Sequence, residues 1–296
     1  MSITVIGESN IDIAVRQHGP EIKGGCTPAD ICFYHGGVAR NIAHNLCLLG
    51  HEVSLATVFG DDDFAEQMMD ECHTLGIDLS LSSQFEDTQS PIFLSFNDEI
   101  GNMQSAVSDI GLNSYMDLDW IRDRIDAINR ADWMVADTLL STKALSFLLN
   151  HCLVPLFIDT VSPNRALRLA EAMDKSWKKS FFALKCNLAE AQALTRASEA
   201  ESAAKLLVNK GIEEVYLTLG EEGVCFCSKK KFHHVPAIET EAINVTGSGD
   251  AFFAGVIHAH AIGQSEKSIE YGLKAACHNV KSEAPVNPEF QANCLQ

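Results

Sequence analysis

Short apolar runs alternate with longer amphipathic stretches along most of the chain. Six runs have the continuity of buried strands, at 3–7, 53–60, 133–137, 155–159, 181–186 and 213–220. Stretches such as 63–76, 141–152 and 201–211 place apolar residues at helical spacing. Continuous apolar strands separated by helices predict an α/β domain, in which a parallel sheet is covered by helices on both faces.

Two regions interrupt this rhythm. Residues 11–35 and 81–110 read as short strands joined by turn residues, and the α/β pattern resumes after each. We expect the two segments to pair into a small β-sheet that acts as a lid. The main domain then comprises 1–10, 36–80 and 111–296. Open edge strands on such a sheet would also allow a homodimer through the lids.

Composition narrows the classes of function. The 296 residues carry a formal net charge of −18, which disfavours a nucleic-acid partner, and the only basic run, Lys229–Lys231, reads as a solvated loop. No stretch approaches the roughly 20 apolar residues of a membrane span, and no secretory signal is apparent. The ten cysteines include no C-x-x-C pair, so we expect free thiols in a reducing cytoplasm.

The sharpest chemical pattern is the segment Asn244–Asp250, which runs directly into a helix-like stretch. Gly247, Ser248 and Gly249 would let backbone N–H groups point at an anion, and the start of a helix favours negative charge. Asp250 lies where it could accept a proton from an attacking hydroxyl. From this segment alone, a plain N-cap after a tight turn remains an equal interpretation.

Three further segments carry polar groups at the ends of strands or the starts of helices. Gly36 and Gly37 precede a predicted helix that carries Asn41, and amides suit polyol hydroxyls. Asn187 and Glu190 have the spacing of one helical turn, which suits either water-mediated magnesium binding or a capping box. The turn that contains Thr218, Gly220 and Gly223 would line a nucleotide pocket or form a simple hairpin.

Taken together, these motifs resemble a known family. The segments GGVARNIAHNLCLLG and NVTGSGDAFFAG are similar to the two signatures of ribokinase-like carbohydrate kinases, also called the phosphofructokinase-B family. GESNID, LKCNLAE and TLGEEG occur between or before them in the order and spacing usual in that family, so the resemblance covers essentially the whole chain. It implies a three-layer α/β/α domain with a β lid and an ATP- and Mg²⁺-dependent sugar or nucleoside kinase.

The resemblance also implies roles for individual positions. Asp250 would be the catalytic base, with the anion hole formed by Gly247, Ser248 and Gly249. Asn187 and Glu190 would organise magnesium through water, beside a nucleotide bordered by Thr218, Gly220 and Gly223. Substrate hydroxyls would be held by Asn10, Asp12, Gly36, Gly37 and Asn41. Asn244 stands where many relatives have Asp at a monovalent-cation site, which puts activation by potassium in doubt.

Similarity beyond the signatures, in VADTLLS, FIDTVS and EAPVNPE, favours pseudouridine as the substrate, phosphorylated at its ribose 5-hydroxyl. Its C-linked uracil has one more ring N–H than uridine, and candidate partners are Asp109, Asn113, Asp137 and Thr138. Ribose, fructose and ordinary nucleosides remain alternative substrates. A non-catalytic regulator on the same scaffold is disfavoured by the intact Asp250 and its glycines. Nicotinamide and P-loop motifs are missing.

Overall fold

The body of the protein is built on one large sheet. The computed structural model describes residues 1–22, 24–99, 103–176 and 181–295. Its main sheet has eight strands in the order β14-β13-β12-β11-β10-β9-β1-β4. The strands are β1 (Ser2–Ile6), β4 (Glu52–Ala56), β9 (Trp133–Asp137), β10 (Leu156–Asp159), β11 (Phe181–Asn187), β12 (Ile212–Thr218), β13 (Val224–Ser228) and β14 (Phe232–Val235).

All neighbouring pairs from β4 to β12 are parallel, and β13 and β14 extend the sheet antiparallel at one edge. Five of the six predicted strands lie in it as single strands, whereas the run 53–60 contributes only its first half, β4, because Val58–Phe59 belongs to a separate two-stranded sheet. The main sheet is therefore mixed, although its parallel part agrees with the predicted α/β class.

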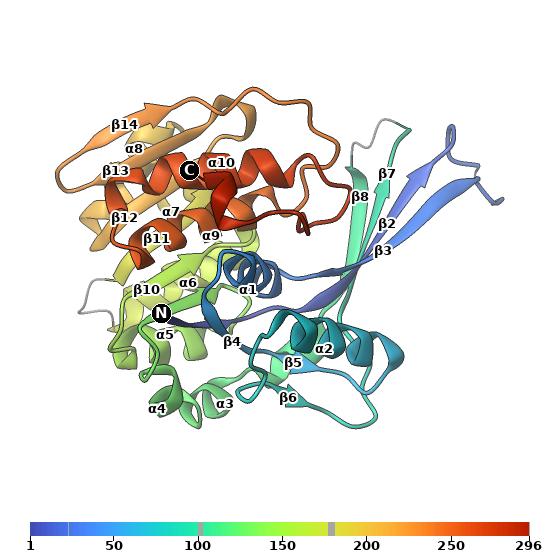
Figure 1. Cartoon of the computed structure of the whole chain (residues 1–296), viewed down its shortest axis with the longest axis horizontal. Helices are drawn as coiled ribbons and strands as arrows, with labels where there is room; N and C mark the ends of the chain where they lie inside the picture. Colours follow the sequence, from blue (N-terminus) through green and yellow to red (C-terminus); the bar gives the residue numbers. More distant parts are fainter. Residues whose placement is uncertain (23, 100–102, 177–180, 296) are drawn as a thin grey trace.

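Helices cover both faces of this sheet (Figure 1). One face packs against α3 (Leu118–Arg122), α4 (Ile125–Ile128), α5 (Thr142–His151), α6 (Pro163–Ser176), α7 (Leu188–Thr195) and α8 (Ala200–Asn209). The other packs against α1 (Val38–Leu48), α9 (Ser248–Ala261) and α10 (Ser268–Asn279), with α2 (Asp63–Leu75) beside α1. Short 3₁₀ turns are η1 (Gly111–Tyr115), η2 (Gly220–Glu222), η3 (Ser265–Lys267) and η4 (Ala292–Leu295).

Alternation along the strands creates two apolar cores. Met134 and Ala136 of β9 enter the core under α5 and α6, whereas Val135 between them enters the core under α9. Burial on both faces explains why these strands read as continuous apolar runs. The three layers of the predicted α/β/α fold are thus present. No helix in the described ranges combines the length and apolar character that crossing a bilayer requires.

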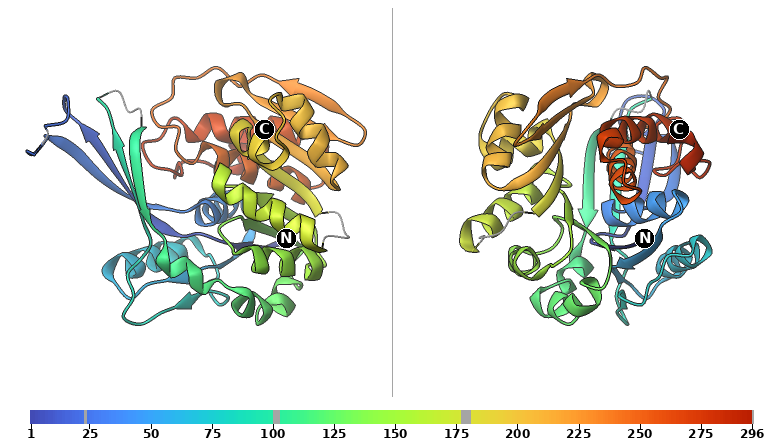
Figure 2. Two further views of the ribbon diagram at one scale, coloured as in Figure 1. Left: turned by 180° about the vertical axis from the view of Figure 1, so that it is seen from behind. Right: turned by 60° about the vertical axis from the view of Figure 1, so that its left-hand side comes forward.

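A second sheet projects from the body, as Figures 1 and 2 show. Its four strands are β2 (Asn10–Gln17), β3 (Ala29–Gly36), β7 (Ile92–Asn97) and β8 (Met103–Asp109), in the order β3-β2-β7-β8. We call it the lid sheet. The parallel pairing of β2 with β7 joins the segments 11–35 and 81–110, of which positions 23 and 100–102 lie outside the described residues.

The start of the second segment belongs elsewhere. Within 81–110, β6 (Ser83–Gln84) pairs with β5 (Val58–Phe59) of the body instead of with the lid sheet. Ser83 is held there by the Trp120 indole N–H at 3.0 Å and the Arg124 guanidinium at 2.7 Å. The lid sheet therefore takes only the later part of that segment, from Ile92 onward.

Candidate active site

Site residues from distant parts of the sequence meet where the parallel strands end. The turn after β1, the ends of β9, β10 and β11, and the first turns of α1 and α9 converge on one edge of the main sheet. The base of the lid sheet, at Asn10 and Gly36, adjoins the same edge. In open α/β sheets ligands bind in this crevice, outside the carboxyl ends of the strands.

Asp250 occupies the first turn of α9. The helix begins after Gly247, whose φ of 74° is left-handed, and a Cβ there would lie 2.0 Å from the Pro285 carbonyl oxygen. Only glycine fits this turn. The Ser248 N–H donates to the Val245 carbonyl, and the N–H groups of Gly249 and Asp250 follow in the turn, where a helix has no internal acceptors. Of the residues predicted to form an anion hole, Ser248 thus has its N–H engaged within the turn, and the N–H groups of Gly249 and Asp250 lie at the helix start, where an anion would bind.

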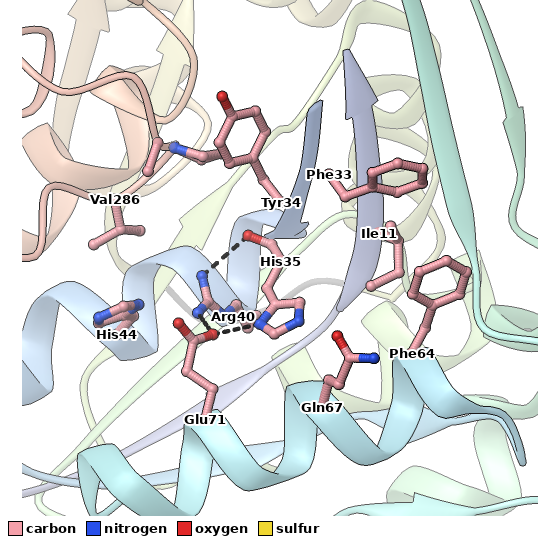
Figure 3. A pocket seen from close by; sticks show the side chains of 12 residues that line it. Ile11, Phe33, Tyr34, His35, Arg40, His44, Phe64, Gln67, Glu71 and Val286 are labelled. Atoms are coloured by element: carbon pink, nitrogen blue, oxygen red, sulfur yellow. Dashed lines mark hydrogen bonds and ion pairs between the residues drawn. The ribbon is translucent and has the colours of Figure 1, made fainter. Parts of the chain in front are cut away.

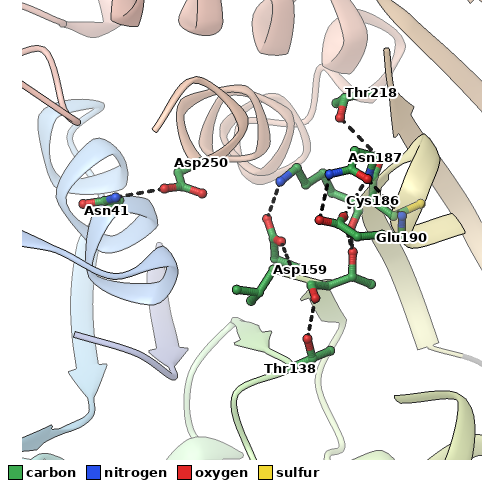
Figure 4. Close-up of polar contacts among 11 residues, drawn as sticks. Asn41, Thr138, Asp159, Cys186, Asn187, Glu190, Thr218 and Asp250 are labelled. Atoms are coloured by element: carbon green, nitrogen blue, oxygen red, sulfur yellow. Dashed lines mark hydrogen bonds and ion pairs between the residues drawn. The ribbon is translucent and has the colours of Figure 1, made fainter. Parts of the chain in front are cut away.

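The Asp250 carboxylate is buried and fixed by a single amide. Asn41 Nδ2 donates to Asp250 Oδ2 at 2.9 Å across the interface of α1 and α9 (Figure 4). Burial raises the pKa of Asp250 to about 7, although the nearby Lys185 ammonium opposes this shift. Asp159 adds to the increase through charge repulsion. A carboxyl group with a pKa near neutrality is well matched to accept a proton at physiological pH.

Lys185 was not singled out from the sequence, yet it lies at the centre of the site. Its ammonium group pairs with Asp159 at 2.9 Å, and a Cβ on Gly249 would come within 2.8 Å of it. The pKa of Lys185 stays above its usual value because Asp159, Asp250 and Glu190 outweigh the effect of burial. The ammonium thus adds positive charge directly beside the start of α9. The sequence signal that could have pointed to Lys185 is the presence of a lysine inside an otherwise apolar strand.

Asn187 and Glu190 form a complete capping box at the start of α7. Glu190 is buried, and its carboxylate accepts from the Asn187 N–H at 2.8 Å and from the Thr160 hydroxyl at 2.6 Å. Figure 4 shows the Asn187 and Glu190 side chains next to each other. Capping orients the pair and leaves Asn187 exposed toward solvent. No cluster of three His, Cys, Asp or Glu side chains suited to a metal occurs among the described residues.

The predicted nucleotide residues line one cavity. Thr218, Gly220 and Gly223 share a pocket of about 640 Å³ with Ser248 and Gly249, two residues of the predicted anion hole. This volume lies within the range of small-molecule sites. Gly223 has a φ of 99°, and a Cβ there would lie 2.1 Å from the Val235 carbonyl oxygen, so the turn requires glycine. A hairpin and a pocket wall were alternative interpretations, and the turn between β12 and β13 is both.

The predicted sugar-binding residues lie on the opposite side of Asp250. Asn10 donates to Asp12 at 2.6 Å, and the Asp12 carboxylate fills the space that a Cβ on Gly36 would need. Burial raises the pKa of Asp12 to about 6, while the Asn10 hydrogen bond opposes the increase. Gly37, with a φ of 95°, packs against the Glu8 carbonyl oxygen and begins α1. Asn10, Asp12, Gly36, Gly37 and Asn41 are thus brought together.

Of the four side chains considered for the uracil ring, three are engaged within the fold. Asp137 accepts from the Glu8 N–H at 2.7 Å and the Leu139 N–H at 2.9 Å, and burial raises its pKa to about 7. Thr138 donates to the Thr160 carbonyl oxygen. Asp109 accepts from the Gly111 N–H in an exposed turn, and its register with Ile92 puts it on the face of the lid sheet away from Asp12.

Asn113 differs because its amide lies in a buried polar cluster with Glu8 and Arg165. Glu8 accepts from Arg165 Nη1 at 2.8 Å and from Asn113 Nδ2 at 3.4 Å. Asn113 Oδ1 is buried and has no hydrogen-bond partner within the described structure. Glu8 also adds to the raised pKa of Asp12, which places the cluster near the sugar-binding residues. Arg165 was missed from the sequence because it belongs to no recognised motif, and Glu8 because it was quoted only as part of GESNID, where no role was given to its side chain.

The side chain of Asn244, at the start of the segment Asn244–Asp250, hydrogen-bonds to backbone groups of the surrounding loops. Its amide donates to the Glu283 carbonyl at 2.7 Å and accepts from the Thr246 N–H at 2.9 Å. The side chain therefore stabilises the turn that leads into Gly247.

Comparison with known proteins agrees with this geometry. The sequence pattern of the pfkB family carbohydrate kinases matches residues 1–291. The chain is similar to the pseudouridine kinase of Escherichia coli, with 30% identity over 97% of this chain and 93% of the relative. It is 26% identical to the guanosine-inosine kinase of Exiguobacterium acetylicum, over 95% of this chain and 94% of that one.

Its fold resembles that of Arabidopsis thaliana ribokinase solved with ribose and ATP. The TM-score is 0.82 at 19% identity, and the match covers 99% of this chain and 96% of the ribokinase. The prediction from the two signatures is confirmed: the chain belongs to the pfkB family of carbohydrate kinases and is an ATP-dependent carbohydrate or nucleoside kinase.

Proposed function

We propose that this enzyme transfers the γ-phosphoryl group of ATP to the 5-hydroxyl of pseudouridine. The observation that carries the reaction is the position of Asp250, a buried carboxylate with a raised pKa at the start of α9, held by Asn41 and close to Lys185. Asp250 would take the hydroxyl proton while the hydroxyl oxygen bonds to the γ-phosphorus. The bond from that phosphorus to the β-phosphate oxygen breaks, and ADP leaves.

The residues around the phosphoryl group would supply positive potential. N–H groups of Gly249 and Asp250, together with the Lys185 ammonium, would face the transferring group, where fixed donors cost no reorganisation during reaction. Asn187 and Glu190 would hold Mg²⁺ through water, and Mg²⁺ when bound neutralises charge on the β- and γ-phosphates. The lid sheet, which carries Asp12 on β2, would cover the substrate and exclude water from the reacting group.

The choice of pseudouridine rests on the polar cluster of Glu8, Asn113 and Arg165. If the reacting hydroxyl faces Asp250 and the ribose contacts Asp12 and Asn41, the remote end of the substrate extends toward this cluster. Asn113 Oδ1 lacks a donor, and a ring N–H would satisfy it. Arg165 could donate to a ring carbonyl. The similarity to a relative named pseudouridine kinase gives independent support.

The test is a panel of acceptors assayed with ATP at matched concentrations: pseudouridine, uridine, adenosine, ribose and fructose. We expect the highest kcat/KM with pseudouridine. A higher value with ribose or fructose would reject the nucleoside assignment and favour a sugar kinase. A higher kcat/KM with adenosine or uridine would agree with a nucleoside kinase and would reject only the assignment of pseudouridine as the preferred nucleoside.

We further propose a homodimer through the lid sheets. One face of the lid sheet carries a row of cross-strand neighbours, Phe33, Ile13, Leu94 and Val107. Phe33 and Val107 at its ends are 56% and 59% exposed. Ile13 and Leu94 between them are half-buried, and Phe33 also stacks on Phe64 of α2, so the exposed apolar area lies at the ends of the row, where a second copy would offer a matching surface. Sedimentation equilibrium should give twice the chain mass, with Val107→Asp shifting the protein to monomer. A monomeric parent protein would reject the dimer.

A further inference from the structure

The catalytic carboxylate is connected to the base of the lid sheet through one buried arginine. Arg40, in the first turn of α1, is 2% exposed and donates to the His35 carbonyl oxygen of β3 at 3.1 Å. It also pairs with Glu71 of α2. Figure 3 shows these contacts beside a pocket of about 250 Å³ between the lid sheet, α1 and α2. The family signatures assign no role to this side chain.

Arg40 also fixes the orientation of its neighbour Asn41. Arg40 Nη1 donates to Asn41 Oδ1 at 3.2 Å, and Asn41 Nδ2 donates to Asp250 Oδ2 at 2.9 Å. An amide has one accepting and one donating end, so the guanidinium determines which end faces Asp250. If the Asn41 oxygen faced Asp250 instead, the Asn41 NH₂ group would face the Arg40 guanidinium, and two donors would oppose each other. With Arg40 in place, the NH₂ end therefore faces Asp250.

We propose that Arg40 is a positioning residue that acts on Asp250 through Asn41, by holding the Asn41 amide in the orientation that donates to the catalytic carboxylate. This inference rests on the proposed role of Asp250 as the base. Glu71 anchors the guanidinium from α2, and the His35 carbonyl ties it to β3. The contacts Glu71–Arg40–Asn41–Asp250 thus connect the lid sheet and α2 to the reaction centre.

Loss of Arg40 should change the titration of Asp250 in a definite direction. A freed Asn41 amide can turn its oxygen toward Asp250, and an oxygen there favours the protonated carboxyl group. The same rotation removes the Asn41 hydrogen bond that lowers the pKa of Asp250, so this pKa should rise. Other groups that act on Asp250 are Lys185 of β11, Asp159 of β10 and Asp12 of β2. Arg40 itself faces Glu71, His35, His44 and Asp12. In the parent enzyme, burial and the Arg40 charge lower the pKa of His44 to about 3; in Arg40→Gln burial still lowers this pKa, although the contribution of Arg40 is lost.

The experiment is the pH dependence of kcat/KM for Arg40→Gln, with the parent enzyme titrating near neutrality. We expect the acidic limb to move to higher pH by about one unit and kcat to fall about fivefold at pH 7, because the ionised fraction of Asp250 falls by that factor. In an Asn41→Ala background, Arg40→Gln should add no further shift, because the two residues act in series. Arg122→Gln, at an exposed arginine of α3 paired with Asp119, is the matched control and should leave the profile unchanged.

The outcomes separate this inference from the proposed function. An unmoved acidic limb in Arg40→Gln, or an undiminished shift in the Asn41→Ala background, overturns the positioning role and leaves the base assignment intact. Activity retained in Asp250→Asn overturns the base assignment itself. If Arg40→Gln does not fold, Arg40→Lys is judged by the same shift, since a lysine keeps the charge but has a single donor group for three partners.

Discussion

The two ends of the active site are built in different ways. At the end that we propose to bind the phosphoryl group, the structure relies on backbone geometry within short contiguous segments, such as Gly247–Asp250 and the capping box at Asn187. At the end that we propose to bind the base, the polar cluster consists of single side chains from three elements: Glu8 after β1, Asn113 in η1 and Arg165 in α6.

This difference follows from the physical requirements of each end. A phosphate group is recognised by several N–H donors, which a glycine-rich turn at a helix start supplies through its backbone. A heterocycle is recognised by a few directed side-chain donors and acceptors. Such side chains can come from any element that reaches the site. Residues for phosphoryl transfer are therefore expected in contiguous sequence motifs, whereas the residues that determine substrate specificity depend on which elements the fold brings together.

The largest expected effect is at the reaction centre. Asp250→Asn should lower kcat by about 10²–10⁴-fold, because the amide cannot accept the hydroxyl proton, while pseudouridine binding measured by titration calorimetry should remain. Asp70→Asn, at an exposed carboxylate of α2, is the matched control. Turnover of Asp250→Asn within tenfold of the parent would exclude Asp250 as the base.

A second change tests whether the phosphoryl end depends on close backbone approach. Gly249→Ala places a methyl group 2.8 Å from Lys185 Nζ, so the ammonium must move from its position beside the start of α9. We expect kcat to fall about 10–100-fold with ATP and little change in the preference among acceptors. Gly111→Ala is the control, because a Cβ there meets only Asp109 Oδ1 at 3.5 Å. Unchanged kcat would show that the lysine position is not needed.

A smaller effect is expected at the other end, and it should appear in specificity. Asn113→Ala removes the unpartnered Oδ1 and should reduce the ratio of kcat/KM for pseudouridine over uridine by about tenfold. Asn209→Ala, at an exposed position ending α8, should leave the ratio unchanged. If Asn113→Ala lowers activity equally with both nucleosides, the cluster has a structural role and does not read the base.

The same contrast explains what the sequence could predict. The strands of the main sheet could be predicted because their burial on both faces produces uninterrupted apolar runs, and the proposed anion hole stands out because its glycines are nearly adjacent in sequence. Lys185 was passed over as part of an apolar strand, and the interaction of Glu8 with Arg165 spans 157 residues. Asp109 carried the right chemistry, but register put it on the other face of the lid sheet, which no local pattern specifies.

The smallest expected effect concerns stability and again involves Asp250. Its pKa is about 7 in the folded protein and 3.8 in a solvated chain, so the folded state binds more protons between these values, and the free energy of unfolding falls as pH rises. Without substrates, Asp250→Asn should therefore raise the Tm by about 2 °C or more at pH 8, where the parent carries a buried charge. At pH 5 the parent carboxyl group is protonated and resembles the amide, so the two proteins should differ less. Thermal scans at both pH values check this, with Asp70→Asn as the control. A lower Tm for Asp250→Asn at pH 8 would mean that the ionised carboxylate is compensated by Lys185 and costs the fold nothing.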